Sequence, residues 1–366
     1  MDELVTEMAC KKARKHNRRS EDMVFFEHEQ YANIVSLKNS VNAMSYTPGS
    51  NYSFIHRRGS KPREVFAAEP EMKALMAHLL NRIEPLIEKR LSPCTYNNRV
   101  GMGTQAAVNK VIENMYACSH GYTTQAWIIK LDFKGYFPNM VQQIAYEQFC
   151  DIIINEYKGN DKDELLFIAR RACFFDSSDF ARRSPRSEWD DIPSYKSIYA
   201  RPDGIGGLIG FTFWQKVASI YPSKIDNFIT ENVTPYYVRF VDDCVLITDN
   251  KEMTLASIPT IREMCAEIGI TVHPSKFYCQ PVERGLEFLG FHIKPWAVHI
   301  NRRIVRRAFK AARDETKGND GYMDAINSYL GMIKSTSDID KAKALLDAVN
   351  RPGFEKDYNE LKLVMK

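Results

Sequence analysis

The sequence predicts an α+β fold, in which an antiparallel sheet is combined with helices, and three observations support this prediction. Strand-like runs alternate with helical stretches between residues 126 and 298. Residues 71–90 repeat apolar side chains at helical spacing and end in Lys and Arg, as a core-facing helix does. Residues 302–313 (RRIVRRAFKAAR) combine six cationic side chains with an apolar helix face. We therefore expect a sheet in the middle of the chain with helices on either side of it.

Composition sets the outer limits. The chain has 366 residues, a net charge of +4 and no apolar run of transmembrane length. It is long enough for two or three subdomains, and its acidic start (Met1 to Leu4) lacks the apolar core of a signal peptide. The eight cysteines are scattered without a CxxC pair, which favours free thiols in a cytoplasmic protein over a zinc site or disulfides. Because the charge is modest, affinity for nucleic acid must come from local patches.

Two adjacent carboxylates, Asp242 and Asp243, lie between strongly β-forming runs in residues 236–248. This pattern predicts a tight hairpin with both carboxylates at its tip. Neighbouring anions against apolar strands repel each other and lose hydration, and a hard divalent cation is the simplest compensation. Most Asp-Asp pairs lie in solvated turns, so the pair alone leaves that interpretation open.

A third carboxylate, Asp132, ends the apolar run 127–131 far upstream. It is followed by Gly135, two aromatic residues and Pro138, which stops the strand. The alternative is an N-cap for a following helix. One Asp at a strand end and two at a neighbouring hairpin tip would together hold a pair of Mg²⁺ ions, with Mn²⁺ as a substitute. Such a pair binds the attacking 3′-oxygen and the leaving pyrophosphate of a phosphoryl transfer.

Two basic stretches are candidate contacts for nucleic acid. Residues 11–19 (KKARKHNRR) predict a helix or a flexible arm, and residues 302–313 predict a helix. A solvated surface run is the alternative for each. On a helix, the cations of the second stretch would suit the phosphates of a duplex, and the candidate contacts are Arg302, Arg303, Arg306 and Arg307.

Two further segments carry cations next to turns. Residues 55–65 predict a β-hairpin that offers Lys61 and Arg63 to a triphosphate, with an exposed basic turn as the alternative. Residues 96–107 predict a Gly-rich turn that opens a helix. There Gly101 and Gly103 allow close approach of the backbone to phosphate, and Arg99 is the candidate contact to the template.

Residues 131–137 (LDFKGYF) resemble the first palm motif of reverse transcriptases, and residues 240–243 (FVDD) resemble their catalytic box, with Phe240 in place of the usual Tyr. The resemblance extends from about residue 52 to 335 and points to bacterial group II intron-like enzymes, in particular those of diversity-generating retroelements. It implies a right-hand polymerase fold. The implied parts are a basic N-terminal arm (1–20), fingers (21–125), a palm (126–298) with an insertion or mobile loop at about 176–204, and a short helical thumb (299–366).

The resemblance also implies roles for single residues. Phe137 aligns with the aromatic gate that excludes a 2′-hydroxyl, with an ordinary core Phe as the alternative. Lys276, at the end of 269–276, would protonate pyrophosphate, with an exposed lysine as the alternative. Gly290, in the strand-like segment 287–293, matches the primer grip. The implied metal ligands are Asp132, Phe133, Asp242 and Asp243; the implied nucleotide contacts are Lys61, Arg63, Phe137, Ile209, Gly210 and Gln215; the implied template and primer contacts are Arg99, Gly101, Gly103, Gly290 and the four arginines of 302–307.

The segment 206–215 (GGLIGFTFWQ) separates subgroups of these enzymes. Ile209, Gly210 and Gln215 resemble the diversity-generating pattern, whereas Trp214 stands where that pattern has Ser. An apolar Ile209 beside the nascent base pair cannot hydrogen-bond to it, so the resemblance implies low fidelity, especially opposite template adenine.

The function that the resemblance implies is RNA-directed synthesis of DNA in a diversity-generating retroelement. The expected partners are an RNA template, in the form of a dedicated structured RNA, a DNA or RNA primer, deoxynucleoside triphosphates and a small accessory protein. The expected setting is the cytoplasm of a bacterium, from a bacterial or phage gene, without a membrane. Two alternatives stay open: a defence-associated reverse transcriptase with its own non-coding RNA, and an inactive RNA-binding scaffold.

Overall fold

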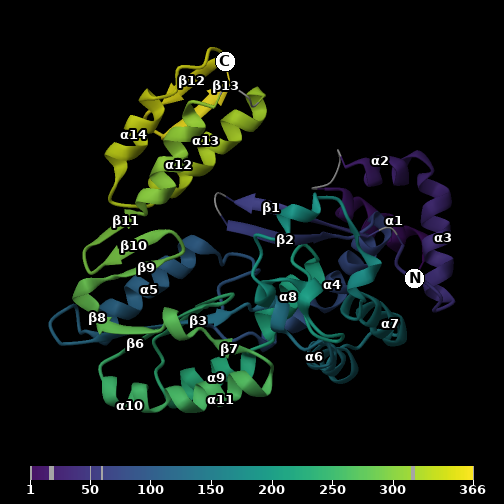
Figure 1. Ribbon diagram of the computed structural model, residues 1–366, viewed down its shortest axis with the longest axis horizontal. Helices are drawn as coiled ribbons and strands as arrows, with labels where there is room; N and C mark the ends of the chain where they lie inside the picture. The colour runs from purple at the N-terminus through teal and green to yellow at the C-terminus, as the bar shows by residue number, and fades with distance from the viewer. Residues whose placement is uncertain (1, 16–19, 50, 59–60, 315–317, 366) are drawn as a thin grey trace. The chain divides into compact units, whose positions relative to one another are not determined.

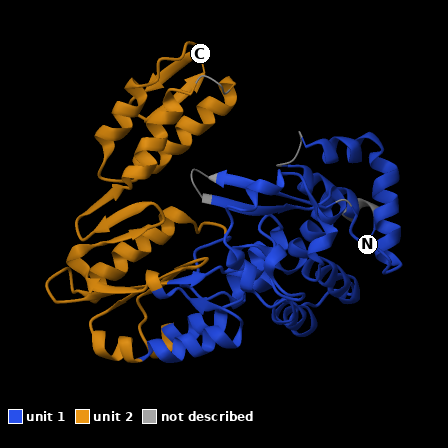
Figure 2. Ribbon diagram, viewed as in Figure 1, with its two compact units in different colours: residues 1–99, 132–229, 257–274 blue, residues 100–131, 230–256, 275–366 orange. Residues whose placement is uncertain are grey.

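The computed structural model describes residues 2–15, 20–49, 51–58, 61–314 and 318–365, and of residues 3–5, Arg58 and Lys61 it describes only the backbone. The chain divides into two compact units, each taken by itself below (Figure 2). Unit 1 comprises residues 1–99, 132–229 and 257–274, and unit 2 comprises residues 100–131, 230–256 and 275–366. Among the described residues, no helix combines the length and apolar character that crossing a membrane requires.

Unit 1 is organised around the long helix α4 (Pro70–Arg90). Its apolar repeat buries Met72, Leu75, Leu79 and Ile83 completely, as the periodicity predicts. Helices on several sides of α4 pack against it, and Figure 1 shows this group. The remaining helices of unit 1 are α1 (Glu3–Arg14), α2 (Glu21–His28), α3 (Gln30–Asn42), α6 (Gln142–Asn155), α7 (Lys162–Cys173), α8 (Thr212–Ile220), α11 (Ile258–Glu267) and the first turns of α9 (Ser223–Asn232).

The predicted hairpin at 55–65 is present in unit 1. Strands β1 (Tyr52–Arg58) and β2 (Lys61–Ala67) pair in antiparallel register, with Phe54 opposite Val65. A short strand, β4 (Ala181–Arg182), adds to the other edge of β1 in parallel. The segment 176–204, expected as an insertion or mobile loop, thus forms a strand and several short 3-10 turns that pack on the hairpin.

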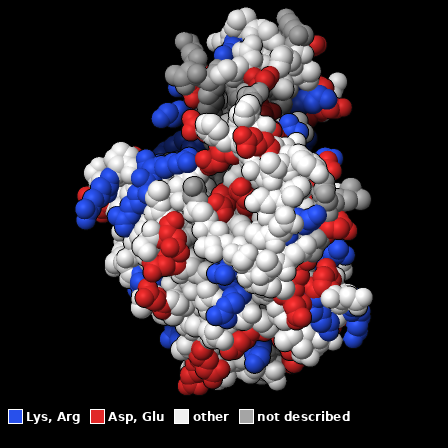
Figure 3. Space-filling view, turned by 90° about the vertical axis from the view of Figure 1, so that its right-hand side faces the viewer, with Lys and Arg blue, Asp and Glu red and all other residues white. Residues whose placement is uncertain are grey.

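The basic N-terminal stretch forms a helix up to Arg14. Helix α1 packs on α4 and buries Thr6, Ala9 and Cys10, so residues 11–14 of the stretch are helical. Residues 16–19 of this stretch lie outside the described residues. Acidic and basic side chains are interspersed over the face shown in Figure 3, in keeping with the small net charge.

Unit 2 contains most of a twisted sheet. Its strands follow the order β5 (Tyr237–Phe240), β6 (Asp243–Thr248), β3 (Trp127–Lys134), and β8 (Tyr278–Pro281) also pairs with β3. The boundary between the units falls inside β3, whose last residues pair with β7 (Thr271–Val272) in unit 1. Helix α5 (Thr104–Cys118) covers β5 and β6, and helix α10 (Lys251–Ala256) follows β6.

The C-terminal part of unit 2 combines helices with small antiparallel sheets. The segment 287–293, expected to be strand-like with a turn at Gly290, forms two antiparallel strands, because Leu289 and Gly290 take positive φ values of 50° and 92° and turn the chain back. Residues 354–365 form a hairpin where helix was expected. The elements are β9 (Leu286–Phe288), β10 (Phe291–Lys294), β11 (Ala297–Ile300), α12 (Arg302–Ala312), α13 (Asn319–Ile333), α14 (Ile339–Asp347), β12 (Phe354–Asp357) and β13 (Lys362–Met365).

Candidate active site

The Asp-Asp pair lies at the tip of a hairpin in unit 2, as predicted. Strands β5 and β6 pair antiparallel, and Phe240 is opposite Asp243. Val241 has φ +59°, which closes the turn directly before Asp242. Arg239, fully buried in β5, donates from Nη1 to the carbonyl of Val241 at 3.2 Å. Both carboxylates are half-buried, so the turn presents them at the surface of the sheet.

Lys130 on β3 contacts this pair, and the sequence reading missed it. Its Nζ lies 3.3 Å from Oδ1 of Asp243 and donates to the carbonyl of Glu287 at 2.9 Å. The same two residues also act on Tyr278 of β8: burial is the largest cause that raises its pKa to about 12, and the charges of Asp243 and Glu287 add to it. A lone cation in an apolar strand, two residues before Asp132, was the available signal.

Asp132 belongs to unit 1 and is 6% exposed. Its carbonyl accepts a hydrogen bond from the His273 amide at 2.7 Å, which anchors the end of β3 to β7. Phe133 follows as a core residue whose ring lies 5.4 Å from that of Tyr136. A carboxylate at this depth, at the end of a strand, is a donor suited to a hard cation.

The turn after Asp132 carries Phe137, the gate candidate. Phe137 is half-buried and begins a 3-10 turn that ends at Asn139. Its carbonyl accepts from the amide of Gly207 at 2.7 Å. Within unit 1 the structure therefore joins the first palm-like motif directly to the segment 206–215.

Ile209 and Gly210 touch strand β2. The Phe66 amide donates to the carbonyl of Ile209 at 2.7 Å. A Cβ on Gly210 would lie 2.1 Å from the Phe66 carbonyl oxygen, and Gly210 has φ +117°, so this close backbone approach requires glycine. The Ile209 side chain is half-buried.

Trp214 is a core residue. It is fully buried, and its Nε1 has no hydrogen-bond partner among the described residues. A Cβ on Gly207 would meet its ring at 2.6 Å, so the indole occupies the space that Gly207 leaves. The departure from Ser at this position is therefore matched by a glycine seven residues earlier.

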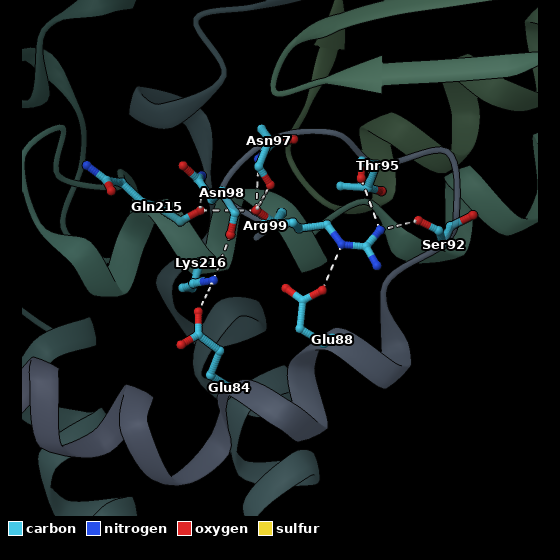
Figure 4. Close-up of polar contacts among 10 residues, drawn as sticks. Glu84, Glu88, Ser92, Thr95, Asn97, Asn98, Arg99, Gln215 and Lys216 are labelled. Atoms are coloured by element: carbon cyan, nitrogen blue, oxygen red, sulfur yellow. Dashed lines mark hydrogen bonds and ion pairs between the residues drawn. The ribbon is translucent and has the colours of Figure 1, made fainter. Parts of the chain in front are cut away.

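Arg99 is held by its own protein (Figure 4). Its Nε donates to Glu88 at 2.8 Å, and its Nη1 donates to the carbonyls of Ser92 and Thr95 at 3.1 and 3.0 Å. Its side chain is 12% exposed. These contacts give Arg99 a positioning role in the loop before α5, and its contact to a template stays a prediction.

Gln215 lies close to the same loop. Its side chain is exposed, and its carbonyl accepts from Nδ2 of Asn98 at 2.8 Å (Figure 4). The next residue, Lys216, donates to the carbonyl of Asn98 and pairs with Glu84 of α4. Helix α8 is thereby tied to the loop that contains Arg99.

The other nucleotide candidate described in unit 1 is Arg63, which is exposed on β2. The side chain of Lys61 lies outside the described part of the chain. Next to Arg63, the carboxylate of Glu64 is buried on the opposite face of the strand. The sequence reading did not single out Glu64.

In unit 2 the candidate glycines adopt conformations that favour glycine. Gly101 and Gly103 have φ values of +73° and +146°, and Gly103 directly precedes α5. Gly290 has φ +92°, and a Cβ there would lie 2.5 Å from Ile304 of α12. Lys276 is exposed in a 3-10 turn. On α12, Arg302, Arg303 and Arg306 are exposed and Arg307 is half-buried.

No protein-family model and no curated protein sequence matches this chain. Solved telomerase structures do resemble it. Apo telomerase from Candida tropicalis aligns with 82% of this chain and 56% of its own, at a TM-score of 0.50 and 12% identity. Its form truncated from the C-terminal domain aligns with 74% of this chain and 60% of its own, at a TM-score of 0.49 and 13% identity. Telomerase from Candida albicans in complex with a telomeric RNA fragment aligns with 86% of this chain and 58% of its own, at a TM-score of 0.49 and 11% identity.

At such low identity the similarity concerns the fold. This chain has a mixed α+β, reverse-transcriptase-like fold, as the motifs predicted. It spans less than two thirds of the length of these telomerases.

Proposed function

We propose that this chain is an RNA-directed DNA polymerase whose reaction centre is formed by Asp132, Asp242 and Asp243. The observation that supports this most directly is the contact between Lys130 and Asp243 at 3.3 Å. Residues two apart on a strand leave the same face, so Asp132 leaves β3 on the face from which Lys130 reaches Asp243. The proposal further requires the carboxylate of Asp242, in the turn directly before Asp243, to reach the same ions.

The donor set fits a pair of hard divalent ions. Carboxylate oxygens are the ligands that Mg²⁺ prefers, and no soft sulfur or imidazole ligand occurs in the two motifs. Asp132 and Asp242 would hold both ions, with Asp243 as a secondary ligand paired to Lys130. When bound, the ions supply charge neutralisation for in-line attack of a 3′-oxygen on the α-phosphate.

The residues of the protein supply positioning. Phe137 would lie beneath the sugar and exclude a 2′-hydroxyl, and Arg63 with Lys61 would contact the triphosphate. The exposed arginines of α12 would contact the phosphates of a template–primer duplex without reading sequence. Residues 21–125 would form the fingers, 126–298 the palm and 299–366 the thumb.

Primer extension tests the proposal. The chain, a primed RNA template, deoxynucleoside triphosphates and Mg²⁺ should give extended DNA. Asp242→Asn should reduce the rate by at least about a thousandfold, because an isosteric amide removes a charged ligand. Extension by Asp242→Asn at the rate of the wild type would reject the mechanism. No extension by the wild type on any primed RNA would favour an RNA-binding scaffold.

The finer assignment follows from Ile209. We propose low fidelity in a diversity-generating retroelement, with a dedicated structured RNA and a small accessory protein as partners. If an apolar side chain at this position relaxes selection, Ile209→Gln should lower misincorporation opposite template adenine without lowering correct incorporation. Equal error rates in Ile209→Gln and the wild type would favour a defence-associated reverse transcriptase instead. Sequencing the RNA that co-purifies with the protein would identify the template.

A further inference from the structure

Glu64 is a buried carboxylate that accepts three hydrogen bonds from a single distant segment. It is 3% exposed. The donors are Trp189 Nε1 at 2.8 Å, Ser197 Oγ at 2.8 Å and the amide of Ile198 at 2.6 Å. All three belong to residues 176–204, which we call the strap. A buried carboxylate is costly unless such donors compensate it, so this contact strongly restrains the strap against β2.

The strap makes further contacts with the hairpin β1–β2. The Arg183 amide donates to the carbonyl of Ser53 at 2.8 Å, and the amide of Ile55 donates to Ser184 Oγ at 2.9 Å. Within the strap, the Arg182 guanidinium lies 3.8 Å from the ring centre of Tyr199, whose hydroxyl lies 2.6 Å from Ser53 Oγ on β1. These contacts fix the first half of the strap along one edge of the hairpin.

The far end of the strap holds the turn that carries Phe137. Arg201 Nη1 donates to Asn139 Oδ1 at 3.0 Å, and Asn139 Nδ2 donates to the carbonyls of Lys134 and Gly135 at 3.0 and 2.7 Å. A Cβ on Gly135 would lie 2.6 Å from the carbonyl oxygen of Tyr195. The strap therefore packs directly against the backbone that follows Asp132.

After the strap ends at residue 204, the chain contacts both the turn that carries Phe137 and strand β2 of the hairpin. The amide of Gly207 donates to the carbonyl of Phe137, and the carbonyl of Ile209 accepts from the amide of Phe66. Hairpin, strap and turn thus form one closed network inside unit 1. Arg63 lies on the opposite face of β2 from Glu64, so the anchor of Glu64 fixes where Arg63 projects.

We propose that the strap sets the distance between the hairpin that offers Arg63 and the turn that carries Phe137. Glu64 and Arg201 are then positioning residues for the incoming deoxynucleoside triphosphate. This inference rests on the proposed polymerase function. Its physical basis is that loss of Glu64 leaves the donors of the strap unpaired and loss of Arg201 leaves the Asn139 acceptor unpaired. Either loss lets the two nucleotide-contacting segments move apart.

Steady-state kinetics on a primed RNA template tests the proposal. Glu64→Gln and Arg201→Ala should each raise KM for the deoxynucleotide about tenfold and change kcat less than about twofold. The double variant should have a KM for the deoxynucleotide only slightly higher than that of either single variant, because both residues act through one network. Arg186→Ala, an exposed position on the strap, is the matched control and should behave as the wild type.

Hydrogen exchange supplies a readout that needs no activity. Glu64→Gln should speed exchange about fivefold or more in the turn 134–139, although that turn does not touch Glu64. Trp189→Phe removes a single hydrogen-bond donor to Glu64, and it should speed exchange in the same turn to a smaller degree. This second variant keeps the test valid if Glu64→Gln folds poorly. Unchanged exchange in the turn, or additive effects on KM, would overturn the strap proposal. If Glu64→Gln speeds exchange in the turn relative to the wild type but the wild type extends no primer, only the polymerase proposal is overturned.

Discussion

At the scale of single residues, Arg99 makes the clearest distinction between contact and positioning. Its guanidinium is engaged by Glu88, Ser92 and Thr95. If it positions the loop before α5, Arg99→Ala should lower the free energy of unfolding by about 1.5–3 kcal/mol, the worth of hydrogen bonds to a charged group.

Glu88→Gln provides the matched comparison for Arg99. A positioning role predicts that both variants weaken RNA binding, measured by fluorescence anisotropy, to a similar degree. A direct contact to the template predicts that Arg99→Ala weakens binding while Glu88→Gln leaves it unchanged, and that outcome would return Arg99 to the template interface.

The pair Trp214 and Gly207 gives a prediction about stability. Because a Cβ at residue 207 would meet the buried indole at 2.6 Å, Gly207→Ala should destabilise the protein by about 1–3 kcal/mol through overpacking. Gly331→Ala is the control: it lies within α13 with open space around it, so it should be neutral or stabilise by about 0.5–1 kcal/mol. Chemical denaturation measures both, and equal effects would contradict the packing account.

Some residues of the candidate site could be predicted from sequence and others could not. Asp242 and Asp243 follow from their β-forming flanks, since alternation and a short turn leave few other structures. Lys130 and Glu64 were missed because their importance depends on partners more than a hundred residues away. A cation within an apolar strand is a local signal, but it does not tell whether that cation faces a carboxylate or water.

At the scale of elements, helix α12 carries a testable charge pattern. Its exposed arginines should each add about one unit to the salt dependence of duplex binding, because each phosphate contact releases a counterion. Arg303→Ala and Arg306→Ala should therefore weaken binding to an RNA–DNA duplex regardless of sequence and flatten the salt slope. Lys343→Ala, exposed on α14, is the control, and an equal loss there would indicate a diffuse charge effect only.

Asp338, just before α14, predicts a pH dependence for the C-terminal helices. Burial alone would raise its pKa, but Lys341, His299 and the amide of Ile300 outweigh burial and hold the pKa below its usual 3.8. Its contribution to stability is therefore present above pH 3.8 and lost as the pH falls through the lower folded value.

Asp338→Asn should accordingly speed hydrogen exchange in α14 at pH 7, by an amount equivalent to about 1–2 kcal/mol. The difference from the wild type should shrink as the pH falls below 3.8. A difference that stays constant over this range would show that the charge of Asp338 is not what stabilises the helix.

Helices and hairpins with strong periodicity were predictable, whereas the strap and the C-terminal hairpin were not. The apolar repeat of α4 determines its buried face wherever the rest of the chain lies. The strap reads as Ser, Asp, Arg and Pro, a composition typical of loops, and its order comes from Glu64 and β1. Long-range hydrogen bonds of this kind leave no periodic trace in sequence.

At the scale of the whole molecule, the fold is the one that the two carboxylate motifs predicted. A reverse-transcriptase-like fold was expected from two carboxylate motifs, and the telomerase comparison supports that fold. The strand order β5-β6-β3 places the hairpin that bears Asp242 and Asp243 beside the strand that leads into Asp132.

The central claim is that Asp132 and Asp242 hold the same pair of ions. Manganese binding, measured by electron paramagnetic resonance with a non-reactive deoxynucleotide analogue and a primed RNA, tests it most directly. We predict about two Mn²⁺ ions per chain for the wild type, and fewer for Asp132→Asn and Asp242→Asn alike. Wild-type stoichiometry in either variant would contradict the claim.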